Sequence, residues 1–366
     1  MAATDHDSRV VAGGKSISRI RALLTEGMVI PAHPLALTSA RRLDEPYQRA
    51  LSRYYHAAGA GGVAVGVHTT QFEIREPKHG LFRPVLELAA DTFNRCDAAA
   101  GRQTVRVAGI CGAIDQAMSE AGIARELGYD IGLVALRGLS NHTEEQLLEH
   151  CRSVMRIIPV MGFYLQTAVG GRVLSYRFWR ALAELEELVA IKVAPFNRYQ
   201  TQDVIRAIRD SGRKDVALYT GNDDAIVLDL LSPTLSNGND ASSGIGFSGG
   251  LLGQWAVWTA RAVSLMQECR RLRTSGSDIP AALLRVAADL TDANAALFDS
   301  ANGFAGCIAG IHEALRRQGL MRGIWCLNPQ ETLGPGQKEE IDRIWAAYPH
   351  LRDDDFVERH LDAWLR

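Results

Sequence analysis

The sequence lacks several features that would assign a protein class at once. No apolar run approaches the twenty residues that a membrane-spanning helix needs. The six cysteines form no C-x-x-C pair, so neither a zinc site nor a disulfide framework is indicated, and reduced thiols are expected. The polar stretch 1–15 has no apolar core of a secretory signal. We therefore expect a cytoplasmic protein without a membrane segment.

A surplus of charge of one sign is also missing. The chain has 40 Lys and Arg against 42 Asp and Glu, a formal net charge of −2. This balance gives no electrostatic reason to expect nucleic acid or an anionic membrane as a partner. A hydrophobic content of 47% and a charged content of 22% are typical of an ordinary globular protein. At 366 residues, the chain is long enough for one large domain or two smaller ones.

Short apolar runs recur along the chain and are separated by stretches with helical periodicity. The runs that predict strands are 27–32, 62–67, 105–110, 131–136, 159–164, 188–195, 216–219 and 244–247. Legible helices between them cover 44–58, 146–157, 175–185 and 201–208. This alternation predicts a (β/α)₈ TIM barrel. A doubly wound open sheet is the alternative, weakened because no strand is followed by a G-x-G-x-x-G turn.

The remaining chain is helical in pattern, over 251–274, 279–301, 306–318 and 335–348. No long linker rich in Pro, Gly or Ser precedes these stretches. We expect an N-terminal extension over 1–26, the barrel over 27–254, and C-terminal helices over 255–366 that pack on the barrel.

Lys192 is the most informative residue, because it ends an apolar run that reads as a buried strand. Desolvation would lower the pKa of such a lysine, and a neutral amine forms an imine with a carbonyl carbon. The alternative is a lysine that extends from the strand end to solvent. Tyr164 is predicted to end the neighbouring strand, where its hydroxyl could relay protons or simply be a rim aromatic.

Other candidates follow from the rule that barrel chemistry gathers at the carboxyl ends of strands. His33 and His68 are predicted at strand ends, for substrate hydrogen bonding or a structural role. Two histidines without a third ligand make a poor metal site, so no metal and no cofactor are expected. Arg198 could hold a substrate carboxylate or form a surface ion pair. Gly221 and Gly246, at the ends of strands seven and eight, are predicted to line the substrate.

The chain resembles the class I Schiff-base aldolases that include dihydrodipicolinate synthase and N-acetylneuraminate lyase, from about Gly27 to about Trp345. The segments that carry the resemblance are 31–34 (PAHP), 58–65 (AGAGGVAV) leading to Thr69 and Thr70, Tyr164 with 191–192 (IK), and 219–223 (YTGND). The resemblance implies that Lys192 forms an imine with a 2-oxo acid, usually pyruvate, and that Tyr164 shuttles protons. It implies that Thr69 and Thr70 hold the keto acid's carboxylate through hydroxyl and backbone N–H groups. It also implies a homo-oligomer, a tetramer or a dimer.

The departures from this family concern the second substrate. The family's Gly-Thr/Ser-Thr-Gly-Glu loop reads Val-His-Thr-Thr-Gln over 67–71, which leaves the register of the two threonines open by one residue. No tyrosine occurs over 138–141, and Val169 stands where the synthases have an arginine, with Arg172 nearby. We therefore expect a lyase or synthase that is not a genuine dihydrodipicolinate synthase. A dehydratase or hydratase-aldolase using the same imine, and a keto-acid-binding barrel without turnover, are the alternatives.

Overall fold

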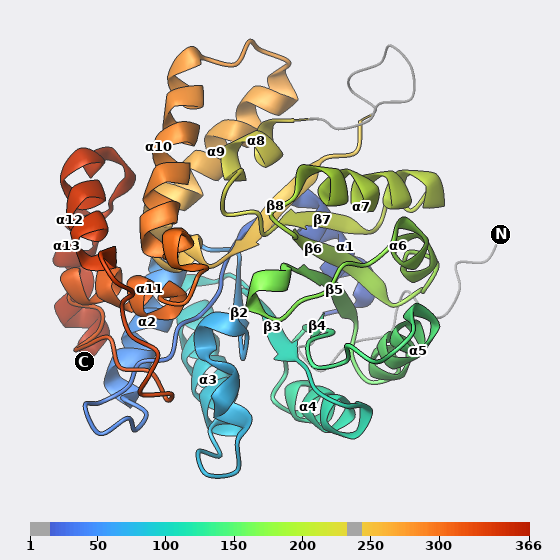
Figure 1. Ribbon diagram of the computed structural model, residues 1–366, viewed down its shortest axis with the longest axis horizontal. Helices are drawn as coiled ribbons and strands as arrows, with labels where there is room; N and C mark the ends of the chain where they lie inside the picture. Colours follow the sequence, from blue (N-terminus) through green and yellow to red (C-terminus); the bar gives the residue numbers. More distant parts are fainter. Residues whose placement is uncertain (1–14, 233–243) are drawn as a thin grey trace. The chain divides into compact units, whose positions relative to one another are not determined.

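Eight parallel strands form one sheet in the computed structural model, which describes residues 15–232 and 244–366. The strands are β1 Val29–Pro31, β2 Gly62–Val65, β3 Val105–Ile110, β4 Ile131–Ala135, β5 Val160–Leu165, β6 Leu188–Ala194, β7 Ala217–Thr220 and β8 Phe247–Leu252. Their order is β1-β8-β7-β6-β5-β4-β3-β2, and a parallel bridge between Ala32 and Ala64 links the chain after β1 to β2 (Figure 1). The predicted (β/α)₈ TIM barrel is confirmed.

One helix precedes β1, and one helix follows each strand from β1 to β7. They are α1 Ile17–Glu26, α2 Glu45–Ala57, α3 Phe82–Ala100, α4 Ile114–Glu126, α5 Glu144–Met155, α6 Tyr176–Leu182, α7 Arg198–Ser211 and α8 Ile226–Leu231. The C-terminal helices are α9 Thr259–Ser275, α10 Ala281–Leu297, α11 Cys307–Arg317, α12 Gln337–Ala347 and α13 Asp354–Leu365. In the described part of the chain, no helix is both long and apolar enough to cross a membrane.

Strand eight was predicted at the wrong place. The prediction was 244–247, whereas β8 is Phe247–Leu252, and the helix expected from residue 251 begins only at Thr259. The glycines of β8 interrupt its apolar pattern, so the sequence does not indicate a strand here, yet the strand requires them. A Cβ on Gly249 would collide with the Met28 carbonyl oxygen, so only glycine permits this close approach. Gly246 therefore precedes β8 at its amino end, away from the strand end where substrate binding was expected.

The described residues divide into two compact units. The first comprises 15–28, 105–222, 228–232 and 244–251, and contains β3 to β7 with most of β8. The second comprises 29–104, 223–227 and 252–366, and contains β1, β2 and the helices from α9 onward. The predicted boundaries at residues 26 and 254 stay a prediction.

In the first unit, the amino-terminal segment is fixed at the amino ends of the strands. The Lys15 ammonium lies 3.0 and 3.1 Å from the two carboxylate oxygens of Asp130, and both side chains are buried. Asp130 directly precedes β4. The Tyr219 hydroxyl of β7 donates to the Leu24 carbonyl oxygen at the end of α1. Buried pairing of this kind fixes the position of α1, because either partner alone would be costly to bury.

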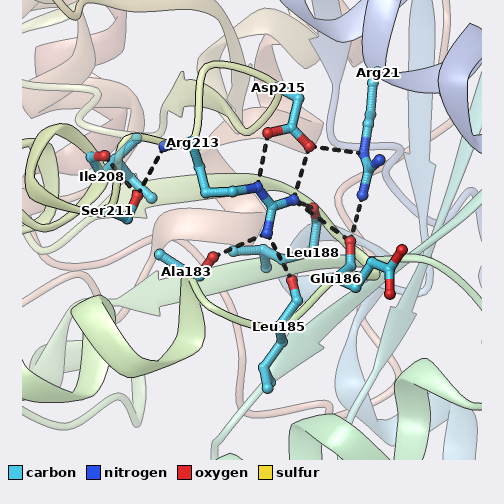
Figure 2. Close-up of polar contacts among 9 residues, drawn as sticks. All are labelled: Arg21, Ala183, Leu185, Glu186, Leu188, Ile208, Ser211, Arg213 and Asp215. Carbon is cyan, nitrogen blue, oxygen red and sulfur yellow. Dashed lines mark hydrogen bonds and ion pairs between the residues drawn. The ribbon is translucent and has the colours of Figure 1, made fainter. Parts of the chain in front are cut away.

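Arg213 fixes the loop that leads into β6, the strand of Lys192 (Figure 2). Its guanidinium donates to the carbonyl oxygens of Ala183 and Leu185 at 3.0 and 3.2 Å and forms a two-pronged ion pair with Asp215. Arg21 of α1 reaches the same carboxylate at 3.2 Å. The Arg213 guanidinium lowers the pKa of Asp215. Arg213 and Arg21 thus fix the start of β6, and the position of Lys192 along this strand follows from it.

In the second unit, α13 is held on α2 by a buried polar centre. The Tyr54 hydroxyl donates to the Asp353 carboxylate at 2.8 Å, and the Gln318 amide donates to the same carboxylate at 2.8 Å. The Tyr54 ring also contacts the Trp364 ring, with centroids 5.5 Å apart. Burial raises the pKa of Asp353. The C-terminal helix is therefore an integral part of this unit.

Candidate functional site

Lys192 lies on the interior face of β6. Successive side chains of a strand alternate between the two faces of a sheet, and residues in register on adjacent strands share a face. Ile191 is in register with Gly162, where an added Cβ would lie 3.0 Å from a side-chain carbon of Leu182 in α6, so these two residues face the helices. Lys192 is in register with Phe163 of β5 and therefore faces the other way.

The Lys192 side chain is buried between an aromatic ring and a glycine. It is 8% exposed, and its Nζ lies 4.3 Å from the centroid of the Phe163 ring. A Cβ on Gly221 would lie 2.7 Å from Lys192 Cε, so the glycine leaves room for the lysine. An aromatic face attracts a cation by about 0.5–2 kcal/mol. Lys192 is therefore buried, in a partly apolar environment.

Tyr164 does not lie beside Lys192, which corrects the prediction of a proton relay. It is in register with Val193 and faces the helix layer, where its ring lies 5.0 Å from that of Trp179. Its hydroxyl exchanges long hydrogen bonds with the backbone of Leu174, at 3.3 and 3.4 Å. Burial raises the pKa of this hydroxyl. Tyr164 is a packing residue of the helix layer.

A register shift between β5 and β6 causes this difference. Val160 is in register with Leu188, 28 residues away, and that spacing would place Tyr164 opposite Lys192. The register then shifts, so Met161 is opposite Ala190 and every later pair is 29 residues apart. One extra residue reverses the face on which a side chain lies. Phe163 takes the place predicted for Tyr164, and sequence reasoning missed it.

Arg198 is held by a buried carboxylate and is not a free anion-binding group. Its guanidinium donates to Asp229 at 2.6 Å, and Asp229 is fully buried while Arg198 is 44% exposed. The second oxygen of Asp229 accepts from the Thr220 hydroxyl at 2.6 Å and the Asn222 amide at 3.0 Å. This cluster anchors the segment that follows β7, next to Gly221. Of the two predicted roles, the surface ion pair describes Arg198 better than binding of a substrate carboxylate, although its acidic partner, Asp229, is buried.

Arg172 also has protein partners. One terminal nitrogen donates to the carbonyl oxygens of Leu139 and His142, at 3.1 and 2.9 Å. It therefore fixes the loop after β4 and is not aimed freely at a substrate carboxylate.

Thr69 and Thr70 lie in the 3₁₀ turn His68–Thr70 after β2, in the second unit. The Thr69 hydroxyl donates to the Ala32 carbonyl oxygen at 2.9 Å, and the Thr70 hydroxyl donates to that of His33 at 2.7 Å. A hydroxyl has one proton to donate. Both hydroxyls therefore tie this turn to the end of β1, and neither can donate to a carboxylate in this arrangement.

His33 is a buried structural residue and does not lie at the open end of the strands. It is fully buried, with Nε2 2.8 Å from the Ser52 hydroxyl and Nδ1 3.0 Å from the Gln48 amide nitrogen, both on α2. Burial lowers the pKa of His33 to about 4. His68 is partly exposed, and its ring lies 5.8 Å from that of Phe72. In residues 15–232 and 244–366, no group of three or more His, Cys, Asp or Glu could hold a metal ion.

Solved structures share this fold. Dihydrodipicolinate synthase from Oceanobacillus iheyensis superposes with a TM-score of 0.71 at 18% identity, over 92% of this chain and 100% of that one. N-acetylneuraminate lyase from Fusobacterium nucleatum, complexed with pyruvate, gives a TM-score of 0.67 at 15% identity, over 88% of this chain and 97% of that one. YagE from E. coli K12, a prophage protein of the dihydrodipicolinic acid synthase family in complex with pyruvate, gives 0.69 at 17% identity, over 88% and 97%. No family model and no curated protein matches the chain. At such identities the likeness establishes the fold.

Proposed function

We propose that Lys192 forms an imine with a 2-oxo acid and that the protein is a carbon–carbon lyase or synthase of the aldol type. The observation that carries this proposal is the position of Lys192, an interior-facing amine on β6 that is 8% exposed, with Gly221 leaving room beside it. The fold supports it, since pyruvate is bound in two of the similar structures.

The chemistry rests on the amine and the ring. The amine of Lys192, in its neutral form, attacks the keto carbon, and the carbinolamine takes up a proton and loses water to give a protonated imine. The imine nitrogen keeps its positive charge, and the face of Phe163 favours a cation at this place. In cleavage, the iminium accepts the electron pair of the bond between the α and β carbons while the β-hydroxyl loses its proton to water, which releases an aldehyde and leaves an enamine. In synthesis, the α carbon loses a proton to water, and the resulting enamine attacks an aldehyde. Phe163 has no proton to transfer, and we assign no proton step to Tyr164.

A keto-acid-binding protein without turnover is the second candidate. The observation in its favour is Phe163, because the residue in register with the lysine carries no acid–base group. Both candidates require the imine, and they differ only in whether a carbon–carbon bond then forms or breaks. The dehydratase and hydratase-aldolase alternatives, the identity of the second substrate and a homo-oligomeric state stay predictions.

Trapping the imine tests the proposal. Pyruvate with borohydride should add one reduced adduct per chain, seen by intact mass and located on Lys192 by peptide mapping. Lys192→Met keeps an apolar chain of similar length against Phe163 and should abolish labelling while retaining the fold by circular dichroism. Lys338→Ala, at an exposed pair on α12, is the matched control and should label like the parent. Labelling elsewhere, or none with any 2-oxo acid, would refute imine formation at Lys192.

An assay with pyruvate and aspartate semialdehyde tests whether the protein is a dihydrodipicolinate synthase. The two arginines near the predicted second-substrate site, Arg172 and Arg198, are already engaged by carbonyl oxygens and by Asp229. An unpaired substrate carboxylate would cost several kcal/mol if buried, or about 10²–10⁴ in rate. We expect turnover far below the typical value of about 10 per second. Turnover at that value would show that an arginine is released to bind the substrate.

A further inference from the structure

The interior face of the adjacent strands β4, β5 and β6 is open to solvent only toward its carboxyl end. Three interior-facing residues deep in these strands are at most 1% exposed: Leu133, Met161 and Ala190. The next interior-facing residues are 5%, 6% and 8% exposed: Ala135, Phe163 and Lys192. Three neighbours that face the helices are again at most 1% exposed: Val134, Tyr164 and Val193. The accessible surface therefore belongs to the face on which Lys192 lies.

Apart from the amine itself, this accessible surface is apolar. Leu165 and Ala194 continue the alternation on β5 and β6, and they are 8% and 5% exposed. A Cβ on Gly221 would lie 2.7 Å from both the Ala194 Cβ and the Lys192 Cε, so the methyl group and the lysine chain border the same space. We call the side chains that surround the amine the apolar face: Ala135, Phe163, Leu165 and Ala194.

The hydroxyl groups of β4 to β7 are directed away from the amine. Thr220 is in register with Val193 and, like Tyr164, faces the helices, where its hydroxyl donates to Asp229 at 2.6 Å. Tyr219 shares the interior face with Lys192, but its hydroxyl donates to the Leu24 carbonyl oxygen of α1. These four strands therefore offer no hydroxyl beside the amine for a polyhydroxylated substrate.

The arginines near these strand ends do not make the apolar face a site for anions. Arg172 and Arg198 are engaged by carbonyl oxygens and by Asp229. Arg137 lies in the turn after β4, and a Cβ on Gly170 would lie 2.8 Å from its Nε, so its side chain lies against the loop after β5. Arg137 is exposed, and water weakens the attraction between exposed charges. A carboxylate buried against the apolar face would lack a close cation, which is costly.

We propose that the aldehyde that adds to the enamine, or leaves it, has an uncharged apolar body of the benzaldehyde type. This proposal rests on imine formation at Lys192. The enamine carbon is two bonds from Nζ, and the aldehyde carbon must approach it to about 3–3.5 Å. The body of the aldehyde then lies against the apolar face, where removal of apolar surface from water favours binding.

The bond changes of the synthetic direction balance without a further reagent. The enamine carbon attacks the aldehyde carbon, and the aldehyde oxygen takes up a proton from water. Water then hydrolyses the imine, which releases a 4-hydroxy-2-oxo acid and restores the amine of Lys192.

Three aldehydes, each supplied with pyruvate, test the proposal: benzaldehyde, succinate semialdehyde and glyceraldehyde. The initial rate of formation of the hydroxy-oxo acid is measured by mass spectrometry on the full-length protein. The kcat/KM for benzaldehyde should exceed the other two values by at least about tenfold. Lys192→Met should form no product with any of them.

Borohydride trapping of pyruvate on the same preparation separates this proposal from the imine itself. If pyruvate is trapped on Lys192 but another aldehyde reacts as well as benzaldehyde, or none reacts, the apolar aldehyde is wrong and the imine stands. If pyruvate is not trapped, imine formation is refuted and this proposal with it.

Variants of the apolar face locate the aldehyde. Leu165→Thr should lower kcat/KM for benzaldehyde by about tenfold and leave trapping of pyruvate within about twofold. Leu88→Thr, at an equally exposed leucine of α3, is the matched control and should react like the parent. Ala194→Ser is the smaller change to use if Leu165→Thr melts well below the parent. Unchanged benzaldehyde kinetics in a folded variant of Leu165 or Ala194 would refute contact with the apolar face.

Arg137→Gln tests the remaining route to a charged substrate. It should leave the ratio of the benzaldehyde and succinate semialdehyde rates unchanged. A loss of about tenfold confined to succinate semialdehyde would show that Arg137 serves a charged aldehyde, and would overturn the proposal.

Discussion

Gly221→Ala is the sharpest test of how Lys192 is placed. The new Cβ would lie 2.7 Å from Lys192 Cε and 2.7 Å from the Ala194 Cβ. Ordinary carbon contacts are about 3.5–4.0 Å, so each overlap is about 1 Å. The Ala194 methyl group is fixed to β6, whereas the lysine chain is flexible. We therefore expect the lysine to move away from its place over Phe163.

The expected size of the effect comes from this geometry. Overpacking of this kind costs about 1–3 kcal/mol of stability. A displacement of about 1 Å at a reacting group can cost about 10² in rate. Gly221 does not have a positive φ, so backbone strain adds nothing and the effect is purely steric. We expect borohydride trapping of pyruvate to slow by about 10²-fold, with a moderate fall in the melting temperature.

The assay is the rate of adduct formation by intact mass, with thermal melting in parallel. Gly122→Ala in α4 is the control, because its added Cβ would have no atom within 4 Å apart from the backbone of its own helix. That change should leave trapping unaltered and stabilise the fold by about 0.5–1 kcal/mol. If Gly221→Ala traps and melts like the parent, Lys192 is not confined as described.

The corrected geometry supports three further predictions. Tyr164→Phe should leave trapping within about twofold and cost about 1 kcal/mol of stability, through the lost contacts with Leu174, as melting and mass measurements can check. His33 has its pKa lowered to about 4, so the unfolded chain binds its proton first and stability falls as pH drops from about 6.5 toward 4. Urea unfolding should show the parent losing about 2 kcal/mol more than His33→Asn between pH 7 and 5; an equal loss would be the contrary result. Asp229→Ala should cost about 3–5 kcal/mol, because it leaves a buried polar cluster unpaired, against less than about 1 kcal/mol for Asp203→Ala at an exposed pair.

The candidate site was predicted in part, and the errors have physical causes. Lys192 is buried on β6, as the surrounding apolar run indicates, and its part in imine formation stays a prediction. Gly221 was predicted to line substrate, and the structure shows that it leaves room for the lysine. His33, Thr69 and Thr70 were placed at the correct strand ends. Their hydrogen-bonding partners could not be predicted, because those partners belong to other elements of the chain.

The sequence by itself determined the alternation of strands and helices, and therefore the barrel, because apolar periodicity is a local property. It also determined that Lys192 lies in a buried strand. Only the tertiary structure decided which residue faces this lysine. The register of β5 against β6 shifts by one residue after Val160, and a one-residue shift exchanges the two faces of a strand. Such a shift depends on how two strands pair, which neither strand encodes alone, so Phe163 and not Tyr164 lies beside the amine.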